Sequence, residues 1–135
     1  MVTNLDALCA QCAQKIVKLS GATRDKDLEN HLRNALGVLQ EDGFYAFHLF
    51  LRYRKLDRQS TGPKDKAWRV WPELEELLQK PELGAPLQGA GEKAVIQMTG
   101  DLQNLLLAKQ LTERTLIYAL YGVRSLPGGG QDDLA

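Results

Sequence analysis

Two cysteines lie three residues apart near the start of the chain, at Cys9 and Cys12. A Cys-x-x-Cys pair can carry out thiol redox chemistry or supply two of the four ligands of a zinc site. The sequence places no second ligand pair nearby, and a redox pair normally lies at a helix N-terminus that follows a strand. Both cysteines instead fall at the centre of the apolar arc of an expected helix. We therefore predict that they belong to the core.

The two histidines and one acidic cluster could also do chemistry. His31 lies at the margin of an apolar helical face and His48 on a cationic stripe, and the spacing places no metal-binding partner beside either. The acidic cluster follows Pro72 and consists of Glu73, Glu75 and Glu76. Its position indicates a helix start, where the helix dipole favours negative charge. No nucleophile elbow, P-loop or dinucleotide-binding turn is present. We expect no catalytic residue, no metal and no cofactor, and so not an enzyme.

The distribution of charge is more informative than the total. The chain has 17 basic and 17 acidic residues, so its formal net charge is zero. Between residues 45 and 71, seven basic residues stand against two acids, a local charge of +5. The basic residues are Arg52, Arg54, Lys55, Arg58, Lys64, Lys66 and Arg69. Residues 72–82 have four acids and one lysine, a local charge of −3. A basic end of this kind suits sequence-independent contacts with the phosphates of nucleic acid.

The segment 44–56 predicts a helix that is apolar almost all round. At 100° per residue, His48, Arg52 and Lys55 fall within an arc of about 60°, with Tyr45 at its edge. We expect this stripe to face solvent and to contact a polyanion.

Aromatic residues near the basic segment could stack on exposed bases. The candidates are Trp68 and Trp71, or Tyr45 and Tyr53. The alternative is that the basic run is a solvated loop and both tryptophans are core.

The elements that would position these residues are all helical, since β-branched residues never alternate over a useful length. We expect helices over residues 4–20, 24–41, 44–56, 65–79 and 92–109, and a last one capped by Thr112. Thr3 or Asn4 should cap the first, Gly43 should end the second, and Pro72 should break or kink the fourth near residues 70–71. The fifth should bury Leu102 and Leu106, among others. This pattern predicts an all-α, compact single-domain bundle of five or six helices over residues 1–126, with a disordered tail at 127–135.

Composition indicates an ordinary globular protein, with 44% hydrophobic and 25% charged residues. No run approaches the roughly 20 apolar residues of a membrane helix, and we expect no signal peptide because no basic segment precedes an apolar one. Two cysteines do not make a disulfide framework. We expect a cytoplasmic protein without membrane contact.

Three local patterns resemble the small helical subunit of type III-B CRISPR effector complexes, the Cmr small-subunit family. In the run 35–51, Asp42-Gly43 ends one helix and an apolar helix follows at once. A Trp-containing helix, residues 67–71, follows a variable basic loop. The chain also ends in a helix pair whose last stretch is residues 116–124. The order of elements matches over roughly residues 5–126.

The resemblance implies a non-catalytic subunit of an RNA-guided antiviral ribonucleoprotein. Copies of it stack along the backbone filament and line the channel of guide and target RNA through basic residues. Its partners would be the backbone and large subunits, copies of itself, and RNA. Only the seven basic residues named above match the family's RNA-binding surface by position.

Two other functions compete with this one. A helical protein–protein adaptor with no nucleic-acid role would present Trp68 and Trp71 as an exposed anchor patch. A small transcription regulator would need a reading helix with polar residues, and the helix at 44–56 is too apolar for that.

Overall fold

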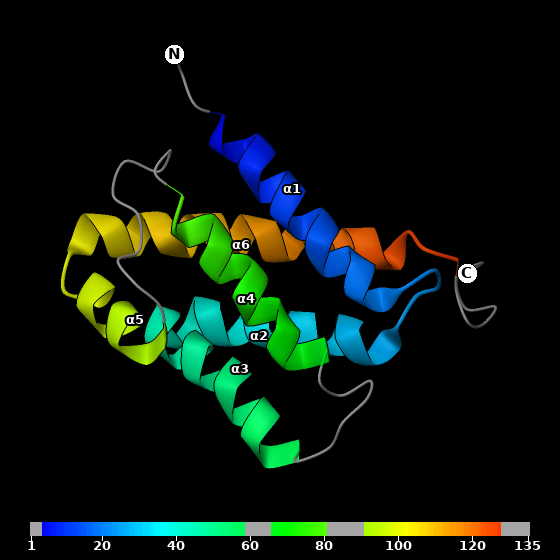
Figure 1. Ribbon diagram of the computed structural model, residues 1–135, viewed down its shortest axis with the longest axis horizontal. Helices are drawn as coiled ribbons and strands as arrows, with labels where there is room; N and C mark the ends of the chain where they lie inside the picture. Colours follow the sequence, from blue (N-terminus) through cyan, green and yellow to red (C-terminus); the bar gives the residue numbers. More distant parts are fainter. Residues whose placement is uncertain (1–3, 59–65, 81–90, 128–135) are drawn as a thin grey trace.

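The computed structural model describes residues 4–58, 66–80 and 91–127, with the backbone alone for residues 52–58, 66–68 and 91. Its elements are α1 (Leu5–Val17), a 3-10 turn η1 (Lys18–Ser20), α2 (Lys26–Asp42), α3 (Phe44–Arg58), α4 (Lys66–Leu78), α5 (Gly91–Thr99) and α6 (Leu102–Arg124). No strand occurs in the described ranges, so the predicted compact all-α bundle is confirmed (Figure 1). The predicted tail lies outside the described residues from residue 128 onward.

Helix α6 is the longest element of the described chain. It packs against α1 and α2, while α4 joins α1 to α3 and α5 contacts α3 and α6. Figure 1 shows α2 and α6 running across the molecule in opposite directions, with α1 crossing α6. Fully buried side chains from five of the helices meet between them. They include Ile16, Leu32, Leu39, Phe47, Leu74 and Leu116.

Acidic and amide side chains begin three of the helices. Asn4 accepts a hydrogen bond from the Ala7 backbone N–H at 3.1 Å, which confirms it as the cap of α1. Asp25 accepts from two backbone N–H groups at the start of α2, and Asp101 accepts from the Asn104 N–H at 3.2 Å at the start of α6. Such caps satisfy N–H groups that have no partner inside the helix.

The joint between α2 and α3 is the single residue Gly43, which was predicted to end α2. Gly43 has a φ of 97°, a left-handed conformation that favours glycine, and its N–H donates to the Leu39 carbonyl at 3.2 Å. Because α3 begins at the next residue, Phe44, the direction of the chain changes within one peptide unit.

The predicted boundary between the last two helices was wrong. The break lies at Gly100-Asp101, and Thr112 is fully buried in the middle of α6 instead of capping it. Leu102 and Leu106 are 68% and 52% exposed, although we predicted that both are buried. The physical reason is the Asp101 cap, which lies eleven residues before the predicted cap, Thr112.

Pro72 does not break α4, which runs continuously from Lys66 to Leu78. A proline inside a helix costs about 3 kcal/mol through a lost hydrogen bond and a steric clash. Val70, Trp71 and Leu74 are all buried around it, and their packing offsets that cost.

The acidic cluster Glu73, Glu75 and Glu76 therefore lies in the second half of α4. The prediction that it marks the start of a helix was wrong. Glu76 in this half forms an ion pair with Lys15 of α1, which joins the two helices.

Candidate nucleic-acid interface

The structure describes only part of the predicted basic surface. Arg69 is exposed on α4, and its side chain is the only described one among the seven predicted residues. Four others lie in α3, where the structure describes their backbone but not their side chains. They are Arg52, Arg54, Lys55 and Arg58. Lys66 is the first residue of α4, and Lys64 lies outside the described residues. Contact of these residues with RNA stays a prediction.

The predicted solvent stripe on α3 is wrong at His48. This side chain is 1% exposed and packs edge-on against Trp71 of α4, with ring centroids 4.5 Å apart and planes at 69°. Helix α4 therefore covers α3 at His48. Leu49, the next residue, is 38% exposed instead.

Two of the four aromatic stacking candidates have described side chains. Trp71 is 3% exposed, so it is core and is available neither to a base nor as an adaptor anchor. Tyr45 is half-buried, and its hydroxyl donates to Glu92 of α5 at 2.7 Å. The side chains of Tyr53 and Trp68 lie outside the described residues.

Neither the cysteines nor His31 form a reactive site in the described part of the chain. Both cysteines are buried, as predicted, and Cys12 donates to the Glu73 carbonyl at 3.3 Å. Burial raises the pKa of the Cys12 thiol to about 12, so the nucleophilic thiolate is absent at neutral pH. His31 is buried and stacks on Phe50 at 5.4 Å. No group of three potential metal ligands occurs among the described residues.

A cluster of arginines that the sequence analysis did not identify surrounds Glu29. Arg24 donates to both carboxylate oxygens of Glu29, from Nε at 2.7 Å and from Nη2 at 3.0 Å. Arg33, one turn along α2, donates to Oε2 at 3.2 Å, and Arg124 from the last turn of α6 donates to Oε2 at 2.8 Å. We call Arg24, Glu29, Arg33 and Arg124 the Glu29 cluster.

The Glu29 cluster combines a buried carboxylate with partly exposed arginines. The Glu29 side chain is 4% exposed, whereas those of Arg33 and Arg124 are 51% and 37% exposed. Hydrogen bonds from Arg24, and then from Arg124, lower the pKa of the Glu29 carboxyl from 4.5 to about 2, although burial acts in the opposite direction. The four residues of the cluster together carry a formal charge of +2.

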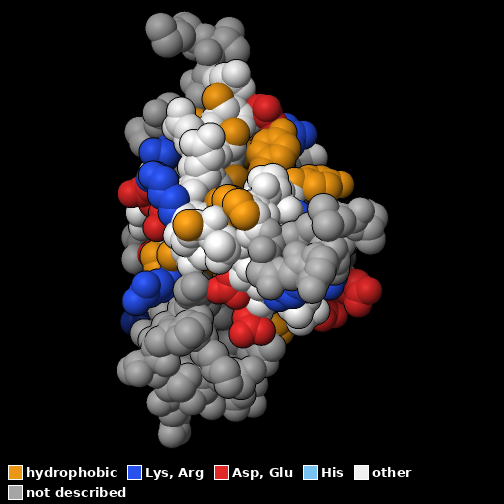
Figure 2. Space-filling model, turned by 90° about the vertical axis from the view of Figure 1, so that its right-hand side faces the viewer, with side chains coloured by type: hydrophobic (Ala, Val, Ile, Leu, Met, Phe, Trp, Pro, Cys, Tyr) orange, Lys and Arg blue, Asp and Glu red, His pale blue; other side chains and the backbone are white. Residues whose placement is uncertain are grey.

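The Glu29 cluster lies where the start of α2 meets the end of α6. The Arg24 N–H donates to the Pro127 carbonyl at 2.9 Å, which ties the start of α2 to the segment after α6. Asp27 lies roughly 160° around α2 from Glu29 and so does not neutralise the arginines directly. Figure 2 looks at this end of the molecule, where the described side chains form small, separate basic, acidic and hydrophobic groups.

One signal in the sequence could have indicated part of this cluster. Glu29 and Arg33 have the i, i+4 spacing of a helical ion pair. Arg124 is 95 residues away from Glu29 along the chain, so only the fold brings it there.

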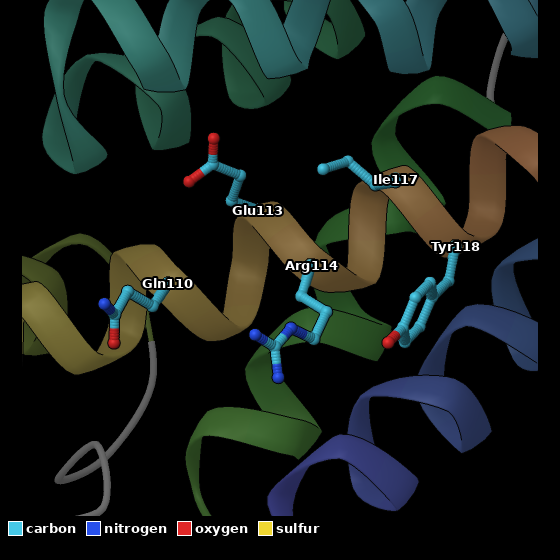
Figure 3. Close-up of a pocket in the computed structure, with 5 residues that line it drawn as sticks. All are labelled: Gln110, Glu113, Arg114, Ile117 and Tyr118. Atoms are coloured by element: carbon cyan, nitrogen blue, oxygen red, sulfur yellow. The ribbon is translucent and has the colours of Figure 1, made fainter.

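The outer side of α6 has a shallow hollow of about 410 Å³ lined by Gln110, Glu113, Arg114, Ile117 and Tyr118. Figure 3 shows Glu113 and Ile117 extending toward α2, and Arg114 and Tyr118 extending toward α1. Glu113 accepts a hydrogen bond from Gln40 of α2 at 2.6 Å. Arg114 and Tyr118 both donate to Asp6 of α1.

Comparison of the chain with protein-family models, with curated proteins and with solved structures finds no match. Among the described residues, no helix is both long and apolar enough to span a membrane.

Proposed function

We propose that this chain is a non-catalytic subunit of a type III-B CRISPR ribonucleoprotein that works in the cytoplasm and contacts guide or target RNA. The order of helices supports the resemblance, above all the immediate α2–α3 joint at Asp42-Gly43. The presence of a terminal helix pair, α5 and α6, supports the resemblance as well. The joint of this pair lies at Gly100-Asp101 and not before Thr112.

The observation that carries the RNA contact is the Glu29 cluster. Arginine guanidinium groups bind phosphate oxygens in a bidentate manner, and rigid arginines lose little side-chain entropy on binding. Glu29 already fixes Arg33 and Arg124, while a large part of each side chain remains exposed. Among the described residues Arg124 uses only its Nε as a donor, so its terminal nitrogens can reach a phosphate.

The proposed subunit binds RNA firmly only within an assembly. With zero net charge and few phosphate contacts per copy, a single chain has weak affinity for RNA. Copies stacked along a backbone filament add their contacts along one RNA, which raises the overall affinity by multivalency.

The alternative is a helical adaptor without a nucleic-acid role. The observation that favours it is the outer face of α6, where Leu102, Leu106 and Tyr121 are 68%, 52% and 65% exposed. Exposed apolar side chains along one helix are typical of a surface that binds another protein.

Affinity purification of the tagged chain from its native host, with identification of bound proteins and short RNAs, tests the proposal. We expect a CRISPR backbone subunit together with guide RNA. A clean monomer, or an unrelated partner without RNA, would overturn the family assignment and favour the adaptor. The purified chain should also show no nuclease activity, with or without divalent metal.

A further inference from the structure

The outer face of α6 has a pattern of side chains that is symmetric about one point, and one of its members, Glu113, also accepts a hydrogen bond from Gln40 of α2. Leu102, Leu106 and Tyr121 are mostly exposed and Ile117 is half-buried. Together with Gln110 and Glu113 these residues fall within an arc of about 100° on the helix.

The members of this stripe form pairs about one point. Leu102 and Tyr121 lie equally far from the midpoint between residues 111 and 112. The same holds for Leu106 with Ile117 and for Gln110 with Glu113. Such a pattern is self-complementary when two copies of the helix run in opposite directions.

We propose that α6 is a self-association surface, which pairs with α6 of a second copy about a twofold axis beside the midpoint between residues 111 and 112. In this pair Leu106 of one copy packs on Ile117 of the other, and Leu102 packs on Tyr121. A twofold interface uses the same patch on both subunits, as this pattern requires. In this arrangement the Leu106 side chain of the second copy would reach the hollow that Ile117 helps to line.

Charge supports the same pairing. Lys109 and Glu113 lie on the same edge of the stripe, about 40° apart around the helix. A twofold axis places this edge of one copy beside the same edge of the other copy. Lys109 of one copy then falls within about one residue's rise, roughly 1.5 Å along the axis, of Glu113 of the other. Lys109 forms no ion pair within the described part of its own chain, whereas Arg114 on the opposite edge is held by Asp6. The dimer therefore gains two equivalent Lys109–Glu113 pairs.

The expected dimer is weak and reversible. A helix of 23 residues is roughly 34 Å long. One such helix pair covers less than the roughly 800 Å² per partner of a standard interface. This inference is independent of the proposed function, because it needs neither RNA nor another subunit.

Sedimentation equilibrium of the full chain from about 10 μM to 1 mM tests the proposal, since weak dimers dissociate in this range. We expect a monomer–dimer equilibrium. Leu106→Arg should weaken it by at least about tenfold, because it places a charge in the apolar seam. Ile96→Arg is the control, since Ile96 is 49% exposed but lies on α5 outside the stripe. A monomer at all concentrations, or a dimer that Leu106→Arg leaves intact, would overturn the proposal.

Charge reversal tests the register of the two helices. Lys109→Glu alone and Glu113→Lys alone should each weaken the dimer, and the double variant should restore it. A structural defect would not be restored in this way, and circular dichroism checks that each variant folds. If the double variant is no better than the single ones, the proposed pairing is wrong.

Discussion

Arg124 in the last turn of α6 donates from Nε to Oε2 of Glu29, a residue in the first turns of α2, over 2.8 Å. This bond joins two helices whose interacting residues are 95 positions apart in the chain. It fixes an arginine at the surface while its partner carboxylate is buried. The same contact therefore stabilises the fold and presents a cation to solvent.

Stability should depend on pH through Glu29. Its pKa is lowered from 4.5 to about 2 in the folded state, so its contribution is complete above pH 4.5 and disappears as pH falls to about 2. We expect a loss of about 1–2 kcal/mol over this window, because the exposed arginines are partly screened by solvent. Urea unfolding at several pH values measures it.

Glu29→Gln should remove most of this dependence and lower stability at pH 7. Glu41→Gln, an exposed position in the last turn of α2, is the control and should behave like the wild type. If Glu29→Gln kept the full acid sensitivity, the Glu29 cluster would not be the source of it.

Two glycine substitutions should have opposite effects. A Cβ on Gly122 would lie 2.6 Å from Cγ2 of Val17, so Gly122→Ala should cost about 1–3 kcal/mol by overpacking the α1–α6 contact. A Cβ on Gly37 would meet nothing within 4 Å, so Gly37→Ala in α2 should gain about 0.5–1 kcal/mol. Thermal unfolding compares them. Val17→Ala should reduce the cost of Gly122→Ala, and an additive double variant would contradict the proposed clash.

Thiol reactivity should report unfolding. Cys9 and Cys12 are buried, and burial raises the pKa of both thiols, that of Cys12 to about 12. We expect little reaction with a colorimetric disulfide reagent at pH 8 in the native state and two thiols in denaturant. Rapid reaction of the native protein would show that the Cys-x-x-Cys pair is accessible.

Two basic residues of α3, Arg52 and Lys55, give a separate prediction. Arg52→Glu with Lys55→Glu should weaken RNA association of the assembled complex, because two phosphate contacts become repulsive. Circular dichroism should show an intact fold. If the double variant unfolds, these side chains are buried, as His48 already is.

Local signals predicted the fold where a single residue decides the geometry. Gly43 ends α2 because only glycine readily adopts a φ of 97°. The start of α6 was missed although Gly100 and Asp101 were a readable stop and cap. The leucine-rich sequence on both sides continued the helical pattern, and Thr112 has the chemistry of a cap.

The candidate site depends on tertiary contacts that no local pattern indicates. His48 belongs to a polar stripe by spacing, but α4 covers it through Trp71. The Glu29 cluster needs Arg124 from the other end of the chain. Periodicity describes one helix at a time, so neither fact could be derived from it.

RNA retention by the assembled complex tests the central claim most directly. The complex would be purified from the native host with Arg33→Gln and Arg124→Gln together, and its RNA content measured across a salt series. Lys93→Gln with Arg114→Gln removes equal charge elsewhere and serves as the control. We predict that the first pair of substitutions lowers RNA retention. It should also reduce the slope of log affinity against log salt concentration by about two, while the control pair should not. Equal retention by both variants would contradict RNA binding at the Glu29 cluster.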